Sequence, residues 1–300
     1  MGSEHAHDIS PRSLSAFGWA AGLNAAYVII EAGFGFSTGS LSLLADAAHN
    51  LTDVGGLLIA WGAAVLALRK PTARHTYGLG QATVLAALIN AIAILMGVGA
   101  IALEAIQRFH EVVNVPAGTV LWVALIGIAV NAGTAILFVR AQRSDLNAHA
   151  AYLHMASDAA SSAGVVVAAG VILWTGWMIV DPIVALLITV AVAWSSFGLF
   201  KSALHMSLGG VPDKIEIADV EKWLHARPGV AAVHDLHVWP LSTTSTALTA
   251  HLVMPGGHPG DAALDHLAHE LGEQFGIAHA TFQIEIGDGP ECHLAPAGVV

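Results

Sequence analysis

Cysteine and charged residues are scarce in this sequence of 300 residues. Cys292 is the only cysteine, so the chain has no internal disulfide framework. Charged residues make up 11% of the chain, against roughly 25% in soluble domains. The net charge of −11 argues against nucleic acid as a partner, because phosphate binding needs a basic patch. The sequence also lacks a Gly-x-x-x-x-Gly-Lys-Ser/Thr loop, so we expect neither a nucleotide cofactor nor ATP as the energy source.

Long apolar runs separate the few charges. Between Glu111 and Arg140 no residue is charged, and between Arg74 and Arg108 only Glu104 is. The hydrophobic share is 55% and the mean hydropathy is +0.67. Runs of about 20 apolar residues are long enough to cross a bilayer as helices. Buried helices of a soluble protein are the alternative, and the uneven placement of charge favours a membrane protein over it.

The pattern predicts six membrane-spanning helices, over residues 15–36, 41–67, 83–107, 118–139, 149–174 and 179–200. The first is not a cleavable signal peptide, since it is long and contains Asn24 and Glu31. An even number of spans puts both termini on one side, and that side holds nearly all the basic residues of the loops and flanks: Arg12, Arg69, Lys70, Arg74, Arg140, Arg143 and Lys201. Only Arg108 lies on the other side. Because cytoplasmic loops carry the excess of Lys and Arg, both termini are predicted to be cytoplasmic, in the inner (cell) membrane.

The last third of the chain has a different residue pattern. Helical spacing over residues 215–227 and 261–275 alternates with strand-like segments at 230–240, 245–254 and 279–286. This order predicts a small α+β domain with helices on one face of a sheet. We therefore divide the chain into an N-terminal tail (1–14), a six-helix transmembrane domain (15–206) and a cytoplasmic domain (207–300), to which the family resemblance described below adds metal binding and dimerisation.

Two His-x-x-x-Asp pairs lie inside predicted spans. His49 with Asp53, and His154 with Asp158, each occupy one face of a helix because they are four residues apart. Two such faces turned toward each other supply four N and O ligands, which suit tetrahedral Zn²⁺. Cd²⁺, Co²⁺ and Ni²⁺ are further candidate ions for this site, whereas the imidazoles argue against Ca²⁺ and Mg²⁺. The alternative to a metal site is that these His and Asp side chains only form hydrogen bonds between helices. Ionisable groups inside a membrane, however, usually mark a substrate path.

The same residues predict how transport is driven. A histidine must lose its proton before it binds a metal ion, so metal and protons compete for one site. A site that opens alternately to each side then exchanges outward metal for inward protons. An intramembrane metalloenzyme would need a base and an open coordination position, as in His-Glu-x-x-His, and the sequence has no such motif. A membrane-embedded metal sensor without sustained transport is the remaining alternative.

Around these pairs the sequence resembles the cation diffusion facilitator family, in particular its zinc/cadmium/cobalt-exporting branch. The similar segments are GSLSLLADAAHNLTDV, HTYGLGQ, LNAHAAYLHMASDAASSAGVVVAA, VDPIVALLI, GVAAVHDLHVWPL and AHATFQIE. The resemblance implies that His49, Asp53, His154 and Asp158 form the transport site. It also implies six transmembrane helices, a cytoplasmic ferredoxin-like α+β domain, a homodimer, and proton-coupled export of metal from the cytosol.

Several other residues are weaker candidates. Asp46, Asn24 and Glu31 lie inside the first two spans and are candidates for an outer ligand shell or an ion path. In the loop after the second span, where some family members place a further metal site, only His75 matches, which makes a complete site there doubtful.

Ten of the 17 histidines lie at or beyond His205, in the cytoplasmic part. The resemblance gives His234, His251, Glu285 and Asp261 as ligand positions for a regulatory zinc ion. Cys292 and His293 add a thiolate-capable pair. On strand parity, His237 is predicted to point to the face opposite His234. The alternative is that these are ordinary surface histidines of a small acidic domain.

Overall fold

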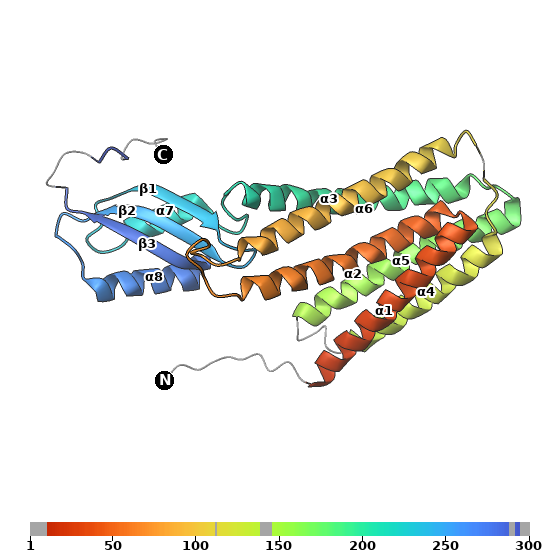
Figure 1. Cartoon of the computed structure of the whole chain (residues 1–300), viewed down its shortest axis with the longest axis horizontal. Helices are drawn as coiled ribbons and strands as arrows, with labels where there is room; N and C mark the ends of the chain where they lie inside the picture. The colour runs from red at the N-terminus through yellow and green to blue at the C-terminus, as the bar shows by residue number, and fades with distance from the viewer. Residues whose placement is uncertain (1–10, 112, 139–145, 288–291, 295–300) are drawn as a thin grey trace. The chain divides into compact units, whose positions relative to one another are not determined.

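The computed structural model describes residues 11–111, 113–138, 146–287 and 292–294. Within its helices, the side chains of 11–21, 52–54, 56–58, 60–61, 137–138 and 146–154 lie outside the description. Six long helices come first (Figure 1): α1 (Pro11–Thr38), α2 (Leu41–Ala67), α3 (Gln81–Gln107), α4 (Ala117–Phe138), α5 (Leu146–Thr175) and α6 (Val180–Ser207). They lie over the six predicted spans, with ends that differ by a few residues.

Four described stretches are long and apolar enough to cross a membrane: Gln81–Gln107, Ala117–Ile136, Met155–Thr175 and Val180–Ser207. The search covered only described residues, and both α1 and α2 include side chains outside that set. Glycines with positive φ, which residues with a Cβ rarely adopt, end α1 at Gly39 (φ 67°) and α5 at Gly176 (φ 72°). Pro182 lies in the first turn of α6, where its missing N–H leaves no hydrogen bond unmade.

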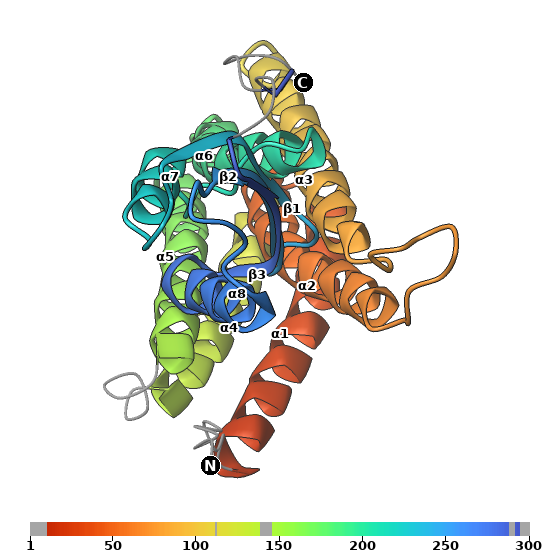
Figure 2. The same cartoon turned by 90° about the vertical axis from the view of Figure 1, so that its left-hand side faces the viewer.

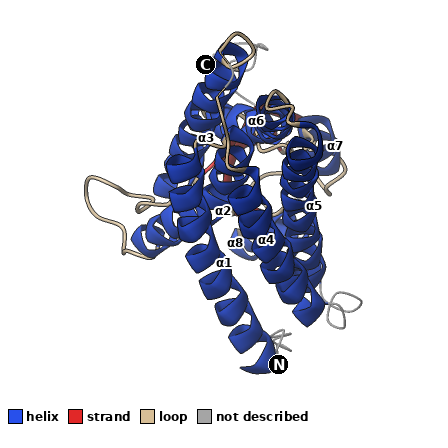
Figure 3. Ribbon diagram, turned by 90° about the vertical axis from the view of Figure 1, so that its right-hand side faces the viewer, coloured by secondary structure: helices blue, strands red, loops and turns tan. Residues whose placement is uncertain are grey.

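The chain divides into two compact units, and each is described by itself. The first combines Met1–Leu58 with Asn90–Phe197, and the second combines Ile59–Ile89 with Gly198–Val300. In the first unit α5 packs along α4, and α1 also packs on α4 (Figure 3). Leu43, Val120 and Val165 form part of a buried cluster that joins α2, α4 and α5. This packing brings polar residues of α1, α2 and α5 together.

The second unit contains the predicted α+β domain. Its elements are α7 (Ile217–His225), β1 (Ala232–Pro240), β2 (Thr246–Val253), α8 (Asp261–Phe275) and β3 (Ile277–Glu285). The strands form one sheet in the order β1-β2-β3, in which β1 pairs antiparallel and β3 parallel with β2. Helix α8 is the crossover that a parallel pair requires, and it packs on β3 (Figure 2). The predicted fold class, helical membrane part plus ferredoxin-like α+β domain, is confirmed.

The two faces of this sheet differ in character. On β2 the alternate residues Leu248, Ala250 and Leu252 face a core that α7 and α8 complete with Val220, Leu224, Leu267 and Leu271. His251 therefore lies on the opposite face, because successive side chains of a strand alternate. That face carries the candidate cytoplasmic ligands.

One strand departs from simple alternation. The β1–β2 register pairs His234 with His251 but His237 with Thr249, so β1 contains a bulge at the intervening residues. Asp235 has φ 48°, within the left-handed region, at this bulge. Since His251 and Thr249 share a face of β2, His234 and His237 share a face of β1. The predicted opposite orientation of His237 is wrong, because the extra residue of the bulge inverts the strand parity.

The second unit also ties the loop between α2 and α3 to the sheet. Gln81, at the start of α3, donates its side-chain amide to the carbonyl of Pro240 at the end of β1. The backbone N–H of Thr243, in the β1–β2 hairpin, donates to the hydroxyl of Thr83 (3.0 Å). The ring of Tyr77 packs edge-on against His279. The first turn of α3 is thus fixed to the hairpin that follows β1.

Candidate metal centres

One residue from each intramembrane pair meets the other between α2 and α5. His49 Nε2 lies 3.3 Å from Asp158 Oδ1, and the Asp158 side chain is only 4% exposed. The side chains of the other two predicted ligands, Asp53 and His154, lie outside the described residues. Their positions in α2 and α5 are four residues from His49 and Asp158, respectively, on the same helix faces. The two helix faces that carry the predicted ligands are therefore in contact.

A cavity of about 740 Å³ borders this contact and is lined by α5 and α6, with His49 at its edge. Besides His49, its polar lining comes from Ser157, Ser161 and Ser195, and the rest is apolar. An imidazole at the edge of a cavity is accessible to a small ion.

A second buried polar layer lies one helix turn from the first. Ser162, four residues after Asp158, donates its hydroxyl to Asp46 Oδ2 (2.7 Å), and Asp46 precedes His49 by three residues. Glu31 of α1 accepts hydrogen bonds from the Tyr27 hydroxyl (2.7 Å) and the Asn50 side-chain amide (3.2 Å). Glu31 and Asp46 are both fully buried.

Asn24 lies apart from that layer. Its side-chain amide points to the sulfur of Met155 on α5 (2.9 Å), while its carbonyl oxygen is buried without a hydrogen-bond partner among the described residues. The contact joins α1 to α5. The structure thus brings Asp46 and Glu31 together but places Asn24 in a separate contact.

The reasoning from sequence assigned no role to Asp181, which is 1% exposed at the start of α6. Its carboxylate accepts four hydrogen bonds from the start of α2, from the hydroxyls of Ser40 and Ser42 (2.6 Å each) and the N–H groups of Leu41 (2.7 Å) and Ser42 (3.2 Å). These N–H groups are among those that a helix start leaves unsatisfied. Asp181 therefore fixes the beginning of the helix that carries His49. An ionisable residue beside Pro182 at the edge of an apolar run was the available signal.

The second centre lies on the helix-free face of the sheet. One ligand atom from each of His234, His251, Glu285 and Cys292 lies within 4.8 Å of all the others. Glu285 Oε1 is 3.0 Å from His251 Nδ1 and 3.3 Å from His234 Nε2, and Cys292 Sγ is 3.8 Å from His251 Nδ1. Three strands and the segment after β3 each supply one residue. Two nitrogens, one oxygen and one sulfur at this spacing form a donor set of the type that holds Zn²⁺.

Asp235, which the reasoning from sequence also missed, lies behind this group. Its two carboxylate oxygens contact His251 Nε2 (3.3 Å) and His237 Nε2 (2.9 Å). Because Asp235 engages Nε2 of His251, the Nδ1 atom of that ring is directed to Glu285 and Cys292. Carboxylates commonly orient metal-binding imidazoles in this way. Only the bulge brings Asp235 to this face, and nothing in the strand pattern signals a bulge.

The surroundings of Glu285 favour its ionised form. Desolvation raises its pKa, but hydrogen bonds from Cys292 and Gln283 and the charges of His234 and His251 outweigh this, so the pKa is lowered overall. A carboxylate that stays ionised suits a cation site.

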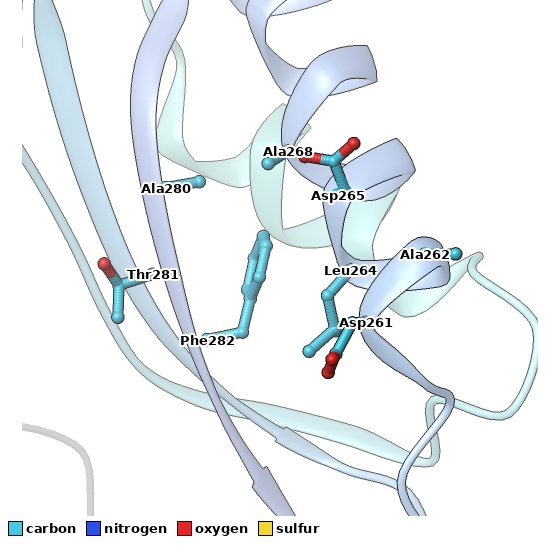
Figure 4. A pocket seen from close by; sticks show the side chains of 8 residues that line it. All are labelled: Asp261, Ala262, Leu264, Asp265, Ala268, Ala280, Thr281 and Phe282. Atoms are coloured by element: carbon cyan, nitrogen blue, oxygen red, sulfur yellow. The ribbon is translucent and has the colours of Figure 1, made fainter.

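Three further candidates lie outside the group. Asp261, at the start of α8, lines a pocket of about 660 Å³ with Asp265 and Phe282, on the side of the sheet that the helices cover (Figure 4). His293 is exposed and is not among the clustered ligands, although it follows Cys292 directly. His75 is exposed in a turn in which its backbone bonds to Thr72. Among the residues that the structure describes, none of the three joins another potential ligand set.

Comparison with known proteins covers nearly the whole chain. Residues 19–206 match the cation efflux transmembrane domain, and residues 212–286 match the cytoplasmic domain of cation efflux proteins. The chain is 38% identical to the zinc transporter ZitB of Escherichia coli K12 over 280 residues, which is 92% of this chain and 89% of the relative.

Two other relatives carry metal-efflux names. The chain is 36% identical to the cation efflux system protein CzcD of Alcaligenes sp. CT14 over 288 residues (95% of this chain, 91% of the relative). It is 34% identical to the cadmium, cobalt and zinc/H⁺-K⁺ antiporter of Bacillus subtilis 168 over 264 residues (86% and 85%). With its apolar helices, the chain is a multi-pass membrane protein. On these matches it belongs to the cation efflux family, the cation diffusion facilitators, a family of transporters.

Proposed function

We propose that this protein exports divalent transition-metal ions from the cytosol, Zn²⁺ first, through a site made by His49, Asp53, His154 and Asp158. The observation that carries the proposal is the 3.3 Å contact between His49 Nε2 and Asp158 Oδ1 across α2 and α5. It brings one imidazole and one buried carboxylate into contact, from helices far apart in sequence. The names of the relatives support zinc as a substrate and leave Cd²⁺ and Co²⁺ open as further ones.

The charge of this site suits a divalent ion. Two carboxylates and two neutral imidazoles have a net charge of −2, so the loaded site is neutral and less costly to bury in lipid. Imidazole with carboxylate favours Zn²⁺ and its neighbours over Ca²⁺ and Mg²⁺. The pocket beside His49 supports the proposal, because it leaves space for a small ion next to that imidazole.

Proton antiport is the proposed driving mechanism. Both imidazoles must be deprotonated before they bind metal, so protons arriving from outside compete with the ion and promote its release there. The Bacillus subtilis relative is named a cadmium, cobalt and zinc/H⁺-K⁺ antiporter, which supports exchange of metal against a counter-ion. The proposal also includes both termini in the cytoplasm, a location in the inner membrane and a homodimeric assembly.

A regulatory zinc site is a second proposed function, favoured by the cluster of His234, His251, Glu285 and Cys292. All four ligand atoms converge, and the carboxylate carries a lowered pKa. A metal held there from three strands stabilises the cytoplasmic domain when cytosolic zinc rises, because a ligand that binds only the folded state shifts the equilibrium toward it. The bond between Gln81 and Pro240 then links that domain to the start of α3.

A flux assay tests the transport proposal. Purified protein in liposomes is given external zinc with a zinc-sensitive dye inside, and the initial rate is compared among wild type, Asp53→Ala, Asp158→Ala and the control Glu104→Gln. Glu104 is a carboxylate of α3 that pairs with Arg108 at the surface, so its loss leaves the site intact. We expect at least a tenfold loss of flux in both site variants and near-wild-type flux in the control.

Two outcomes contradict the proposal. Full flux in folded Asp158→Ala protein would show that the ions pass elsewhere. Tight zinc binding without any flux in the wild type would favour a membrane-embedded sensor instead. Circular dichroism of each variant establishes that it is folded.

A further inference from the structure

Two buried carboxyl groups lie close together inside the membrane part. Glu31 and Asp46 are both 0% exposed, and their carboxyl groups lie close enough to interact with each other. Both Glu31 oxygens accept bonds, from Tyr27 and Asn50. Asp46 Oδ2 accepts from Ser162, but Asp46 Oδ1 has no donor among the described residues. This one oxygen of the pair is therefore buried and unsatisfied.

Among the described residues, no lysine or arginine lies beside the pair, and His49 is a titratable base that acts on Asp46. Helices α2, α4 and α5 contain no lysine or arginine, and the single arginine of α1 is Arg12, near its opposite end. The groups that face the pair are the Tyr27 phenol on α1 and His49 on α2, with Asp158 on α5 one turn away. Helix α4 has no titratable side chain and contributes only the backbone carbonyl of Val123, which accepts a bond from Tyr27 (3.3 Å).

Two buried carboxyl groups this close together favour a proton at this position. Two carboxylates in contact away from water do not both ionise, because like charges repel strongly where solvent does not screen them. One shared proton removes the repulsion and gives Asp46 Oδ1 the bond it lacks, as a hydroxyl that donates to Glu31. Groups that share a proton in this way titrate as a unit rather than individually.

The pair lies next to the proposed transport site. Asp46 precedes His49 by three residues and Ser162 follows Asp158 by four, so the two polar layers are about one helix turn, or ~5 Å, apart along α2 and α5. A divalent ion at the transport site adds two positive charges at this short distance in a medium of low dielectric. Such charges favour the fully ionised form of the pair.

We infer that Glu31 and Asp46 form a proton-binding site, separate from the metal ligands, that holds one of the protons exchanged for metal. This inference rests on the proposed antiport. When metal enters, the Asp46 O–H bond breaks, the proton leaves to cytosolic water and the electron pair stays on Asp46, so the pair changes from one negative charge to two. When metal leaves outward, a proton from external water restores the bond.

Proton release on zinc binding tests the inference directly. Calorimetric zinc titrations of the full-length protein in detergent, run in buffers of different protonation enthalpy, give the number of protons released per ion. We expect Glu31→Gln and Asp46→Asn to release ~1 proton fewer per zinc ion than wild type, since an amide side chain does not ionise at this pH. Glu104→Gln, the carboxylate of α3 outside the site, is expected to match wild type.

A second measurement needs no variant to fold. Infrared difference spectra of the wild type, zinc-loaded minus zinc-free, are expected to show the loss of a protonated-carboxyl band, and this change is expected to be absent from either variant that folds. An unchanged protonated-carboxyl region in the wild type overturns the inference, as does an unaltered proton count in both variants. The failure of transport itself is distinguishable, because it abolishes wild-type flux while these binding measurements are unaffected.

Discussion

The buried carboxylate of Asp181 gives the most sharply defined prediction for stability. It accepts four hydrogen bonds of 2.6–3.2 Å from the start of α2, three of them at Oδ1 and the one from the Leu41 N–H at Oδ2. Replacement by asparagine keeps the size of the side chain. The asparagine side chain has only one oxygen. If that oxygen keeps the Oδ1 position, the amide N–H₂ group takes the Oδ2 position and faces the N–H of Leu41.

The expected loss follows from this geometry. One bond to a charged acceptor, worth about 1.5–3 kcal/mol, disappears, and the N–H of Leu41 becomes a buried donor without a partner, at a similar penalty. The remaining three bonds become neutral and weaker. Allowing for partial relaxation, we expect Asp181→Asn to lower the free energy of unfolding by about 3 kcal/mol, which raises the unfolding constant roughly 150-fold.

Unfolding of the purified protein in mixed micelles, with increasing sodium dodecyl sulfate and loss of helical signal by circular dichroism, measures this change. Asp265→Asn, an exposed aspartate on α8, is the matched control and is expected to unfold like wild type. Because α2 also carries His49, Asp181→Asn is expected to lower the rate of zinc flux as well. If Asp181→Asn and Asp265→Asn unfold at the same detergent fraction, the cap does not stabilise α2 and the reasoning is wrong.

Three further predictions concern other parts of the chain. Gly127→Ala on α4 places a methyl group against the Tyr27 hydroxyl, so we expect lower stability in the same unfolding assay and an altered pH dependence of flux. His251→Ala is expected to weaken zinc binding to the cytoplasmic cluster at least tenfold in a competition titration with a fluorescent chelator, while the exposed His266→Ala leaves it unchanged. For Glu285 the folded pKa lies below the ordinary value of 4.5, so its carboxylate stabilises the domain above that pH and the contribution is lost as the pH falls through the folded value. Glu285→Gln is therefore expected to be less stable than wild type at neutral pH, and the difference in unfolding midpoint is expected to disappear in acid; an equal difference at all pH values would contradict it.

Most of the fold could be predicted because its signals are local. The six long helices follow from apolar runs, which lipid demands of any spanning segment. In the cytoplasmic domain, helical spacing at Val220 and Leu224 and the strand pattern at Leu248 and Leu252 place the same residues in the core that the structure buries. The order of elements then left few ways to cover one face of a three-stranded sheet.

The sites were less predictable where they depend on contacts between distant segments. Spacing alone places His49 and Asp53 on one helix face, but the meeting of α2 with α5 is a matter of packing, and it emerges only in the contact of His49 with Asp158. The cap at Asp181 joins residues 140 positions apart, which no periodicity reveals. The bulge at Asp235 inverts the parity of the second half of β1, so a period of two fails there.

The two metal centres have the same charge balance but different chemistry. The proposed membrane site has two carboxylates and two imidazoles, and the cytoplasmic cluster has one carboxylate, two imidazoles and one thiol that binds metal as a thiolate. Both therefore neutralise a divalent ion. A transport site must release its ion in every cycle, which favours oxygen ligands that protons and water displace readily. A thiolate holds Zn²⁺ and Cd²⁺ more firmly, so Cys292 suits a site that stays loaded and reports the cytosolic metal level.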